Sequence, residues 1–231
     1  MKHTLVAGLP ALKLTLSEQQ ISQFCLYGER LLEKNQVMNL TAIREPEKVA
    51  TLHFLDCMAV LNAAELKNKS LVDVGCGAGF PGLPLKIAEP SIRLTLLDSL
   101  NKRIVWLRDE LLPELGVEAD CVSGRAEEFA ATHREQYDVA TSRAVARLNL
   151  LCELCLPLVK PGGVFLSMKG QDAEEELREA EQAIKILGGK VETVYEYTVE
   201  DAVHRVIVIR KTKPTPPRYP RQFAKIKKQP L

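Results

Sequence analysis

The spacing of apolar residues along the chain changes from a helical period to short runs. Apolar residues recur at three- to four-residue intervals after Ser17 and again after Pro46. Ser17 and Gln20 form a capping-box pattern, and proline is favoured in the first turn of a helix. These patterns predict two amphipathic helices, one from Ser17 to Leu32 and one from Pro46 to Val60, which together form an N-terminal helical cap.

From Ser70 onward, short apolar runs alternate with helical segments. Five runs are typical of strands: LVDVG, LTLLD, ADCVSG, YDVATS and GVFLSMKG. Helical periodicity follows them over residues 83–88, 101–112, 126–131, 148–156 and 173–187. Strands that are apolar on both faces and alternate with helices indicate a parallel sheet covered by helices on both sides.

The last two apolar runs, KVETVYEYTV and HRVIVIRK, flank a short acidic turn at Glu200 and Asp201. Such a turn has no room for a crossover helix, so the two runs should pair antiparallel. The sequence therefore predicts a Rossmann-like α/β fold whose seven-stranded, mostly parallel sheet ends in an antiparallel C-terminal hairpin. We divide the chain into a helical cap (1–66), an α/β domain (67–211) and a C-terminal tail (212–231).

The composition is that of an ordinary globular protein, with 231 residues of which 46% are hydrophobic and 26% charged. No apolar run approaches the roughly 18 residues that a membrane span needs, and Pro10 and Lys13 interrupt the N-terminal apolar stretch. The six cysteines have irregular spacings within apolar segments, and only Cys152 and Cys155 form a C-x-x-C pair. We expect buried reduced thiols, no metal site, and a cytoplasmic monomer that does not bind membranes.

Basic residues are concentrated at the C-terminal end. The net charge is +1, but residues 210–231 carry eight basic residues and no acidic one, which leaves −7 on the other residues. Five prolines exclude a long helix there, so we expect an extended, adaptable tail. Either the tail binds RNA through Arg218 and Arg221, with Tyr219 and Phe223 stacking on bases, or it docks on its own domain.

The stretch LVDVGCGAGFPGLPL places a glycine loop directly after the first predicted strand. Its segment from Gly77 to Gly82 matches G-x-G-x-x-G, and Asp98 ends the second strand about 20 residues further on, where an acid binds ribose hydroxyls. Glycines allow backbone N–H groups to approach an anionic or polar ligand closely. The motif alone fits a dinucleotide or S-adenosylmethionine equally well.

Three features favour S-adenosylmethionine. Asp73 lies within the first strand, where it can approach the amino-acid end of a cationic ligand or cap N–H groups of the loop. Ala126 and Glu127 follow the third strand, where an adenine edge can be bound, although Glu127 can also simply begin a helix. Only a hairpin and a tail follow the fifth strand, which is too little for the substrate domain of a dehydrogenase.

Seven motifs in order resemble the glucose-inhibited division protein B family: NLTAI, HFLDC, DVGCGAGFPGLPL, LLDSLNKR, SGRAEE, TSRAVARL and MKGQ. The resemblance extends from about Leu12 to Lys211, and RYPRQFAKIKKQPL is similar to the basic tail of many members. It implies a class I S-adenosylmethionine-dependent methyltransferase, with residues 67–211 as the catalytic domain. The implied substrate is a guanine N7 in the 530 loop of 16S ribosomal RNA, within the small ribosomal subunit.

The resemblance also implies roles for individual residues. The residues implied in cofactor binding are Gly75, Gly77, Gly79, Phe80, Asp98, Ala126, Glu127 and Arg143. Arg125 and Lys169 match basic positions near the mouth of the active site. His53 shares a helix face with Asp56 and either lines this mouth and contacts RNA or packs beneath the loop, and Asn39 either bonds a flipped-out base or caps a turn with Thr41. Cys57, Cys76 and Ala78 depart from the usual pattern of the family.

Methylation of guanine N7 makes few chemical demands on the protein. N7 has a free lone pair and no proton to remove, so the reaction needs alignment with the methyl group rather than a general base. Since the product is cationic, a cation aimed at N7 would oppose the reaction. We therefore expect Arg125, Arg143 and Lys169 to bind guanine O6, phosphates or the cofactor carboxylate, with Arg143, Lys169 and Asn39 nearest the chemistry.

Other functions remain compatible with the sequence. The enzyme can act on another RNA or on a small molecule, although the cationic tail and strand ends disfavour a small substrate. An NAD-dependent oxidoreductase and a non-catalytic RNA-binding factor of the same fold are alternatives of different classes.

Overall fold

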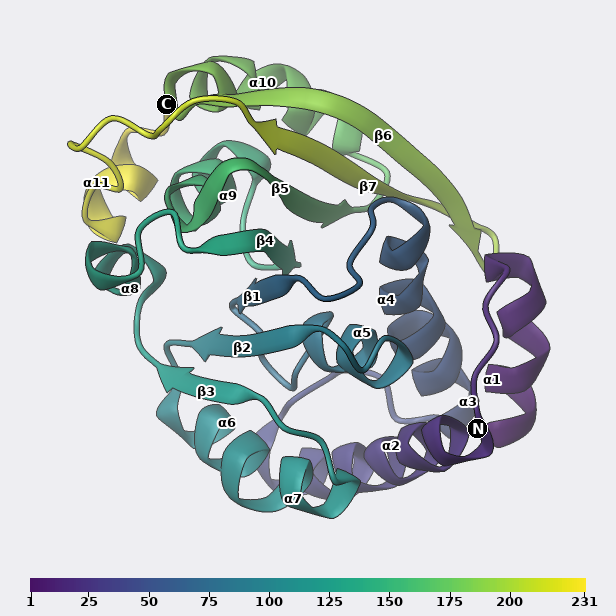
Figure 1. The fold of residues 1–231 in the computed structure, drawn as a ribbon. Coiled ribbons are helices and arrows are strands. Elements are labelled where there is room, and N and C mark those ends of the chain that lie inside the picture. Colours follow the sequence, from purple (N-terminus) through teal and green to yellow (C-terminus); the bar gives the residue numbers. More distant parts are fainter.

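One seven-stranded sheet forms the centre of the computed structural model, which describes residues 1–231 (Figure 1). The strand order is β3-β2-β1-β4-β5-β7-β6. The strands are β1 (Ser70–Val74), β2 (Arg93–Asp98), β3 (Asp120–Ser123), β4 (Tyr137–Arg143), β5 (Val159–Lys169), β6 (Gly189–Val199) and β7 (Ala202–Lys211). Strands β1 to β5 pair parallel, whereas β7 pairs antiparallel with both β5 and β6. This arrangement confirms the predicted sheet and its C-terminal hairpin.

Helices cover both faces of the sheet. The helices that share a core with one face are α2 (Glu18–Met38), α3 (Pro46–Val49), η2 (Ala50–Leu55), α4 (Asp56–Met58), η3 (Ala59–Asn62), α5 (Gly82–Ala88), α6 (Asn101–Trp106), η4 (Leu107–Leu111) and α7 (Leu112–Leu115). The opposite face carries α8 (Ala126–Thr132), α9 (Leu148–Cys155), η5 (Leu156–Leu158) and α10 (Ala173–Ile186). Along β1, Leu71 enters the first core and Val72 the second, because successive strand side chains point to opposite faces.

The N-terminal helices are part of the first core. The predicted capping box is present, because the Ser17 hydroxyl accepts from the Gln20 N–H and the Gln20 side chain accepts from the Ser17 N–H. The predicted second helix begins at Pro46 and continues through η3. Two further elements, α1 (Lys2–Gly8) and η1 (Leu9–Leu12), are short and were not predicted. The division into three units stays a prediction, since the helical cap and the sheet bury a common set of side chains.

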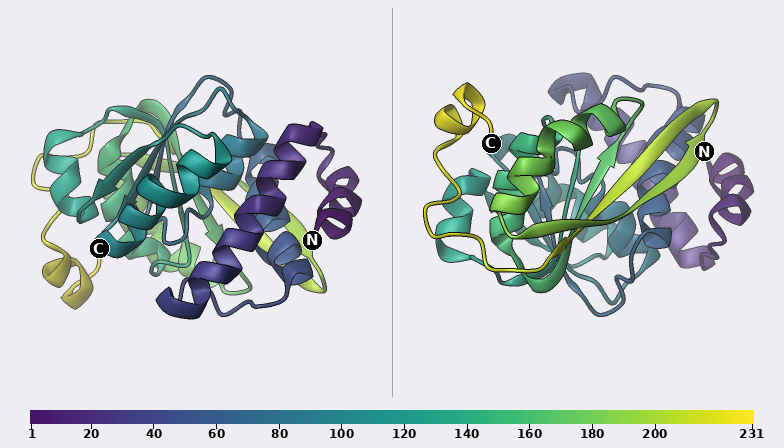
Figure 2. Two further views of the ribbon diagram at one scale, coloured as in Figure 1. Left: turned by 90° about the horizontal axis from the view of Figure 1, so that it is seen from below. Right: turned by 90° about the horizontal axis from the view of Figure 1, so that it is seen from above.

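The two termini occupy opposite sides of the molecule, and the β6–β7 hairpin arches between them (Figures 1 and 2). The far end of the hairpin reaches the helices of the N-terminal region, where the Tyr197 hydroxyl donates to the Asp56 carboxylate at 2.8 Å. Helix α2 runs beside α7, and the Gln23 side chain donates to the Leu115 carbonyl at 2.8 Å.

The C-terminal tail docks on the domain, as one of its two predicted placements requires, and it is extended except at one short helix. Tyr219 and Ile226 are buried, and a short helix, α11 (Phe223–Lys228), follows the last of the closely spaced prolines. The Arg221 guanidinium forms a bidentate pair with Glu153, whose side chain is fully buried. A buried carboxylate needs a cationic partner, and the tail supplies it.

The cysteines are free thiols, and four of the six are buried while Cys25 and Cys121 are half-buried. Burial raises the pKa of Cys152 and Cys155, as expected for core thiols. None of the helices combines the length and apolar composition that a bilayer span requires.

Candidate functional site

The glycine loop joins β1 to α5 at the carboxyl ends of the central strands. Gly75, Gly77 and Gly79 have φ angles of 75°, 58° and 102°, which residues other than glycine rarely adopt. At Gly79, a β-carbon would lie 2.9 Å from the Tyr27 hydroxyl oxygen. The loop thus requires glycine both for its backbone conformation and for its close approach to α2.

Helix α2 packs against the glycine loop. The fully buried Tyr27 donates its hydroxyl proton to the Ala78 carbonyl at 2.6 Å. The Phe80 ring stacks on His53 at 4.5 Å and on Tyr27 at 5.5 Å between centroids, and it is 6% exposed. Phe80 therefore packs beneath the loop in this structure, and its predicted contact with a cofactor stays a prediction.

Two buried carboxylates shape the ends of the loop. Asp73 accepts the Gly82 N–H through Oδ2 at 2.8 Å, while its buried Oδ1 has no partner. Burial raises the pKa of Asp73 to about 7. Asp98 accepts the Gly77 N–H at 2.8 Å through one oxygen and the Leu100 N–H at 2.8 Å through the other. Asp73 thus caps the loop, as one of its two predicted roles requires, and retains one oxygen for a further donor.

Residues predicted to contact the adenine lie at the neighbouring strand end. Ala126 begins α8 directly after β3, Glu127 lies in its first turn, and both are half-buried. Parallel pairing of β1, β2 and β3 brings these residues to the same edge as Gly75 and Asp98. Arg125, the residue before α8, is exposed and lies 5.7 Å from the centroid of the Phe223 ring in the tail.

A cavity of about 560 Å³ opens beside the loop, at the carboxyl ends of β4 and β5. Its lining includes Asp56, Arg143, Val145, Lys169, Tyr197 and His204. The residues of the glycine loop and Asp98 do not line it. The site therefore has two adjoining parts, one built on β1 to β3 and one on β4, β5 and the hairpin.

Arg143 is held on several sides within this cavity. Its guanidinium donates to the Asp56 Oδ2 at 3.0 Å and to the Leu52 carbonyl at 3.3 Å, and it lies 4.7 Å from the Phe80 ring centroid. It also donates to the His53 Nδ1 at 3.0 Å. Burial and the Arg143 charge lower the pKa of His53 to about 4, so the imidazole is neutral and accepts through Nδ1.

This geometry gives His53 a defined place. Because Nδ1 accepts from Arg143, Nε2 carries the proton and donates to the Thr41 hydroxyl at 2.8 Å. His53 thus lies at the mouth and packs beneath the loop at the same time. Its predicted contact with RNA stays a prediction.

Lys169 links the loop between β4 and α9 to helix α10. Its ammonium donates to the Ala146 carbonyl and to the Glu176 carboxylate, both at 2.7 Å, and its side chain is 7% exposed. Glu176 also accepts the Leu148 N–H at 2.6 Å. The same loop places Val145 over the glycine loop, since a β-carbon at Gly75 would lie 2.5 Å from Val145 Cγ2.

Asn39 lies outside the lining of the cavity. It ends α2 in the left-handed conformation, with φ 52°, and is exposed. Asn39 is the C-cap residue of α2, but the side-chain bonds of the turn at Thr41 come from Asn35, and the predicted contact of Asn39 with a base stays a prediction. The Asn35 side chain accepts the N–H groups of Leu40 and Thr41 and donates to the Thr41 carbonyl.

Four residues of the site were not found from the sequence: Tyr27, Glu176, Tyr197 and His204. Each lies in a helix or strand pattern that is equally typical of packing. Their roles depend on partners 51, 7, 141 and 148 residues away, which no local motif indicates.

A family model described as rRNA small subunit methyltransferase G matches residues 7–205. The chain belongs to this family. A relative named "Ribosomal RNA small subunit methyltransferase G" from Alkaliphilus oremlandii is 47% identical over 236 residues, covering 100% of this chain and 99% of its own length. One of the same name from Clostridium botulinum is 44% identical and covers 94% of this chain and 93% of its own length.

Solved structures outside the methyltransferase G family share its fold. The 16S rRNA (adenine(1408)-N(1))-methyltransferase of Catenulisporales acidiphilia, solved with S-adenosylmethionine, has a TM-score of 0.53 at 16% identity, covering 68% of this chain and 91% of its own. The cyclase SpnF has a TM-score of 0.58 at 14% identity, covering 88% and 98%. At such identities the likeness shows the class I methyltransferase fold alone.

Proposed function

We propose that this protein transfers the methyl group of S-adenosylmethionine to N7 of a guanine in the 530 loop of 16S ribosomal RNA. Membership of the methyltransferase G family carries this proposal. The substrate is proposed to be the small ribosomal subunit, which places the reaction in the cytoplasm.

The residues of the glycine loop suit S-adenosylmethionine. The unpaired Asp73 Oδ1 fits the ammonium group of the methionine end, since a buried carboxylate oxygen strongly favours a charged donor. The carboxylate of Asp98 at the end of β2 fits the ribose hydroxyls, and Ala126 and Glu127 fit the adenine edge. When bound, S-adenosylmethionine supplies an electrophilic methyl group on a sulfonium centre.

The adjoining cavity suits the base that is methylated. A volume of about 560 Å³ accommodates one flipped-out guanine, and Val145 both lines this cavity and contacts the glycine loop at Gly75. No residue needs to remove a proton, because N7 presents a lone pair. Arg143 and Lys169 are each paired with a carboxylate, Asp56 and Glu176, so neither faces the base as an unpaired cation.

The docked tail supplies a candidate surface for the RNA backbone. Arg218, Lys225, Lys227 and Lys228 are exposed there, and Arg125 lies beside Phe223 at the edge of the site. Such unburied cations gain affinity by releasing counterions from phosphates. We propose Arg221 as an anchor of the tail rather than an RNA contact, because Glu153 holds it.

Transfer of labelled methyl groups to small ribosomal subunits from cells that lack the modification tests the proposal. Chemical cleavage at N7-methylguanine then locates the product. We expect one cleavage in the 530 loop, lost with Asp98→Ala and retained with Asp109→Asn, which changes an exposed carboxylate paired with Arg108. Transfer to another RNA, or to no RNA while S-adenosylmethionine still binds, would contradict the assigned substrate.

A further inference from the structure

Asp56 is a buried carboxylate that accepts hydrogen bonds from three side chains. Arg143 donates to its Oδ2 at 3.0 Å, while the Tyr197 hydroxyl and the His204 Nδ1 each donate to its Oδ1 at 2.8 Å. The Asp56 side chain is 5% exposed. One buried negative charge thus faces a permanent cation, Arg143, and an ionisable one, His204.

The other groups around His204 add no net charge to Asp56, Arg143 and His204. From β6, Tyr197 meets the His204 ring edge-on at 5.7 Å and is neutral, because burial raises its pKa. From η2, His53 is neutral. The remaining charged groups of the cavity and its rim form ion pairs: Lys169 with Glu176, and Arg147 with Glu179 and Glu175. The net charge at the centre of the cavity therefore depends on Asp56, Arg143 and His204.

The state of His204 decides whether Asp56 fully offsets Arg143. With a neutral imidazole, the pair Asp56–Arg143 carries no net charge. With an imidazolium, two cations share one carboxylate, and one positive charge remains for an anionic ligand. His204 lines the cavity, its side chain is 28% exposed, and Nε2 has no partner within the protein.

We propose that protonated His204 offsets the charge of Asp56, so that the cavity keeps one net positive charge, which attracts a phosphate of the RNA. His204 is then a positioning residue, since it acts through Asp56. The inference rests on the proposed function. A phosphate fits better than the carboxylate of S-adenosylmethionine, because Gly75, Gly77 and Asp98 do not line the cavity.

The expected pH dependence has a definite sign. The hydrogen bond to Asp56, which outweighs the effect of burial, raises the pKa of His204. The imidazolium therefore persists above the pH at which an ordinary histidine loses its charge, and RNA affinity should fall as the pH rises through this raised value. Affinity for S-adenosylmethionine should not follow the same curve.

The experiment measures the equilibrium affinity of small ribosomal subunits, and separately the KM of the methyl transfer, from about pH 6 to about pH 9. The wild-type protein should bind more weakly at the alkaline end. His204→Gln should weaken binding about fivefold at the acidic end and remove the pH dependence, whereas His204→Arg should keep wild-type affinity and also remove it.

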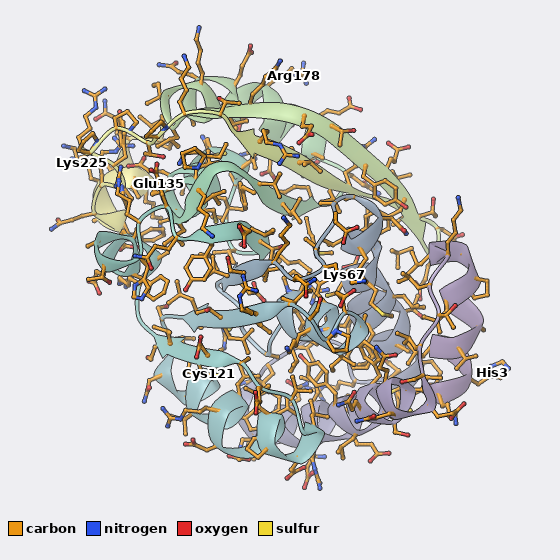
Figure 3. The ribbon with its side chains drawn as sticks, viewed as in Figure 1. His3, Lys67, Cys121, Glu135, Arg178 and Lys225 are labelled. Carbon is orange, nitrogen blue, oxygen red and sulfur yellow. The ribbon has the colours of Figure 1, made fainter.

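Two controls separate charge from structure. Tyr197→Phe removes a neutral donor from the same Asp56 oxygen, so its pH curve should keep the wild-type shape. His3→Gln changes a histidine that projects from α1 to the periphery, far from the cavity, and should leave the curve unchanged (Figure 3).

Three results would overturn the inference: the same RNA-binding curve for His204→Gln and the wild type, the same loss in Tyr197→Phe as in His204→Gln, or a matching pH dependence of S-adenosylmethionine binding without RNA. The last result would assign the charge to the cofactor carboxylate. Absence of methyl transfer by the wild type contradicts the proposed function alone, because RNA affinity is measured independently.

Discussion

The buried carboxylate of Asp73 lowers the stability of the free protein and is also the proposed contact for the ligand's ammonium group. It is fully buried, one of its oxygens holds the start of α5, and the other has no partner. A buried charge of this kind costs folding free energy, and in the proposed function the ammonium group of the bound cofactor offsets this cost.

Asp73→Asn should therefore stabilise the free protein at neutral pH and weaken S-adenosylmethionine binding about tenfold. Unfolded chains ionise Asp73 near its ordinary pKa, whereas the folded chain holds the proton up to about pH 7. The wild type should thus lose stability relative to the variant from about pH 4 to about pH 7, by about 2 to 4 kcal/mol in total, and no more above that. Denaturant titrations across this range, with equilibrium dialysis of labelled cofactor, check both parts. A difference in stability independent of pH would contradict the first.

Single residues could be assigned from the sequence only where the chain itself brings them together. Gly75 and Asp98 follow successive strands of a parallel sheet, so the fold places them at one edge. Asp56 was visible as a neighbour of His53, but its partners on β6 and β7 were not. Their contacts depend on the twist and reach of a hairpin, which strand periodicity does not specify.

Helix α2 is the element that couples the N-terminal region to the glycine loop. Its hydroxyl contact with Ala78 comes from a fully buried residue, so no water replaces it when it is lost.

Tyr27→Phe removes this hydrogen bond and leaves the ring stacking on Phe80 in place. We expect a loss of about 1 kcal/mol in the free energy of unfolding and severalfold weaker binding of S-adenosylmethionine, since the unpaired carbonyl loosens the loop. Tyr195→Phe, on a half-buried strand residue of β6, is the matched control. Calorimetric titration measures the S-adenosylmethionine affinity of the two variants. Equal affinities would show that α2 does not hold the loop.

The tail illustrates what element-level prediction misses. The prolines correctly excluded a long helix, and the alternating strands and helices were placed within a few residues. The sequence left two alternatives for the tail, RNA binding or docking on its own domain. It could not decide between them, because docking depends on Glu153, which in the sequence is one more residue of an apolar helix. Only the fold shows that α9 turns this carboxylate into the core.

Arg221→Gln should destabilise the protein by about 2 to 4 kcal/mol, since it leaves the Glu153 carboxylate buried without its cation. The double variant Glu153→Leu with Arg221→Met should recover most of this loss, because no buried charge remains. Thermal unfolding compares the three proteins. If the double variant were as unstable as the single one, the pair would not be the anchor of the tail.

At the scale of the whole molecule, the charge is divided between a basic C-terminal surface and a net acidic remainder. Docking holds this surface in a fixed place, with Lys225 at the periphery on α11 (Figure 3). RNA would then meet a preformed row of cations rather than a mobile tail.

Replacing Lys225, Lys227 and Lys228 by Gln leaves the buried anchor intact and tests this surface. We expect weaker binding of small ribosomal subunits, and a salt dependence of log affinity whose slope falls by about 2 units if all three contact phosphates. Titrations at several salt concentrations give the slope. Replacement of Lys13, Lys48 and Lys67, which lie in the helical cap and its link to the sheet, is the control. Equal slopes for the two triple variants would separate the tail from RNA binding.

The strand order carries a consequence for how the protein is made. β7, which ends at Lys211, lies between β5 and β6, so the sheet cannot close until nearly the whole chain has left the ribosome. Asp56 is synthesised early, and its partners on the hairpin follow 141 and 148 residues later in the chain. A growing chain therefore holds the glycine loop before the adjoining cavity is finished, and a prematurely terminated product would lack the hairpin that completes this cavity.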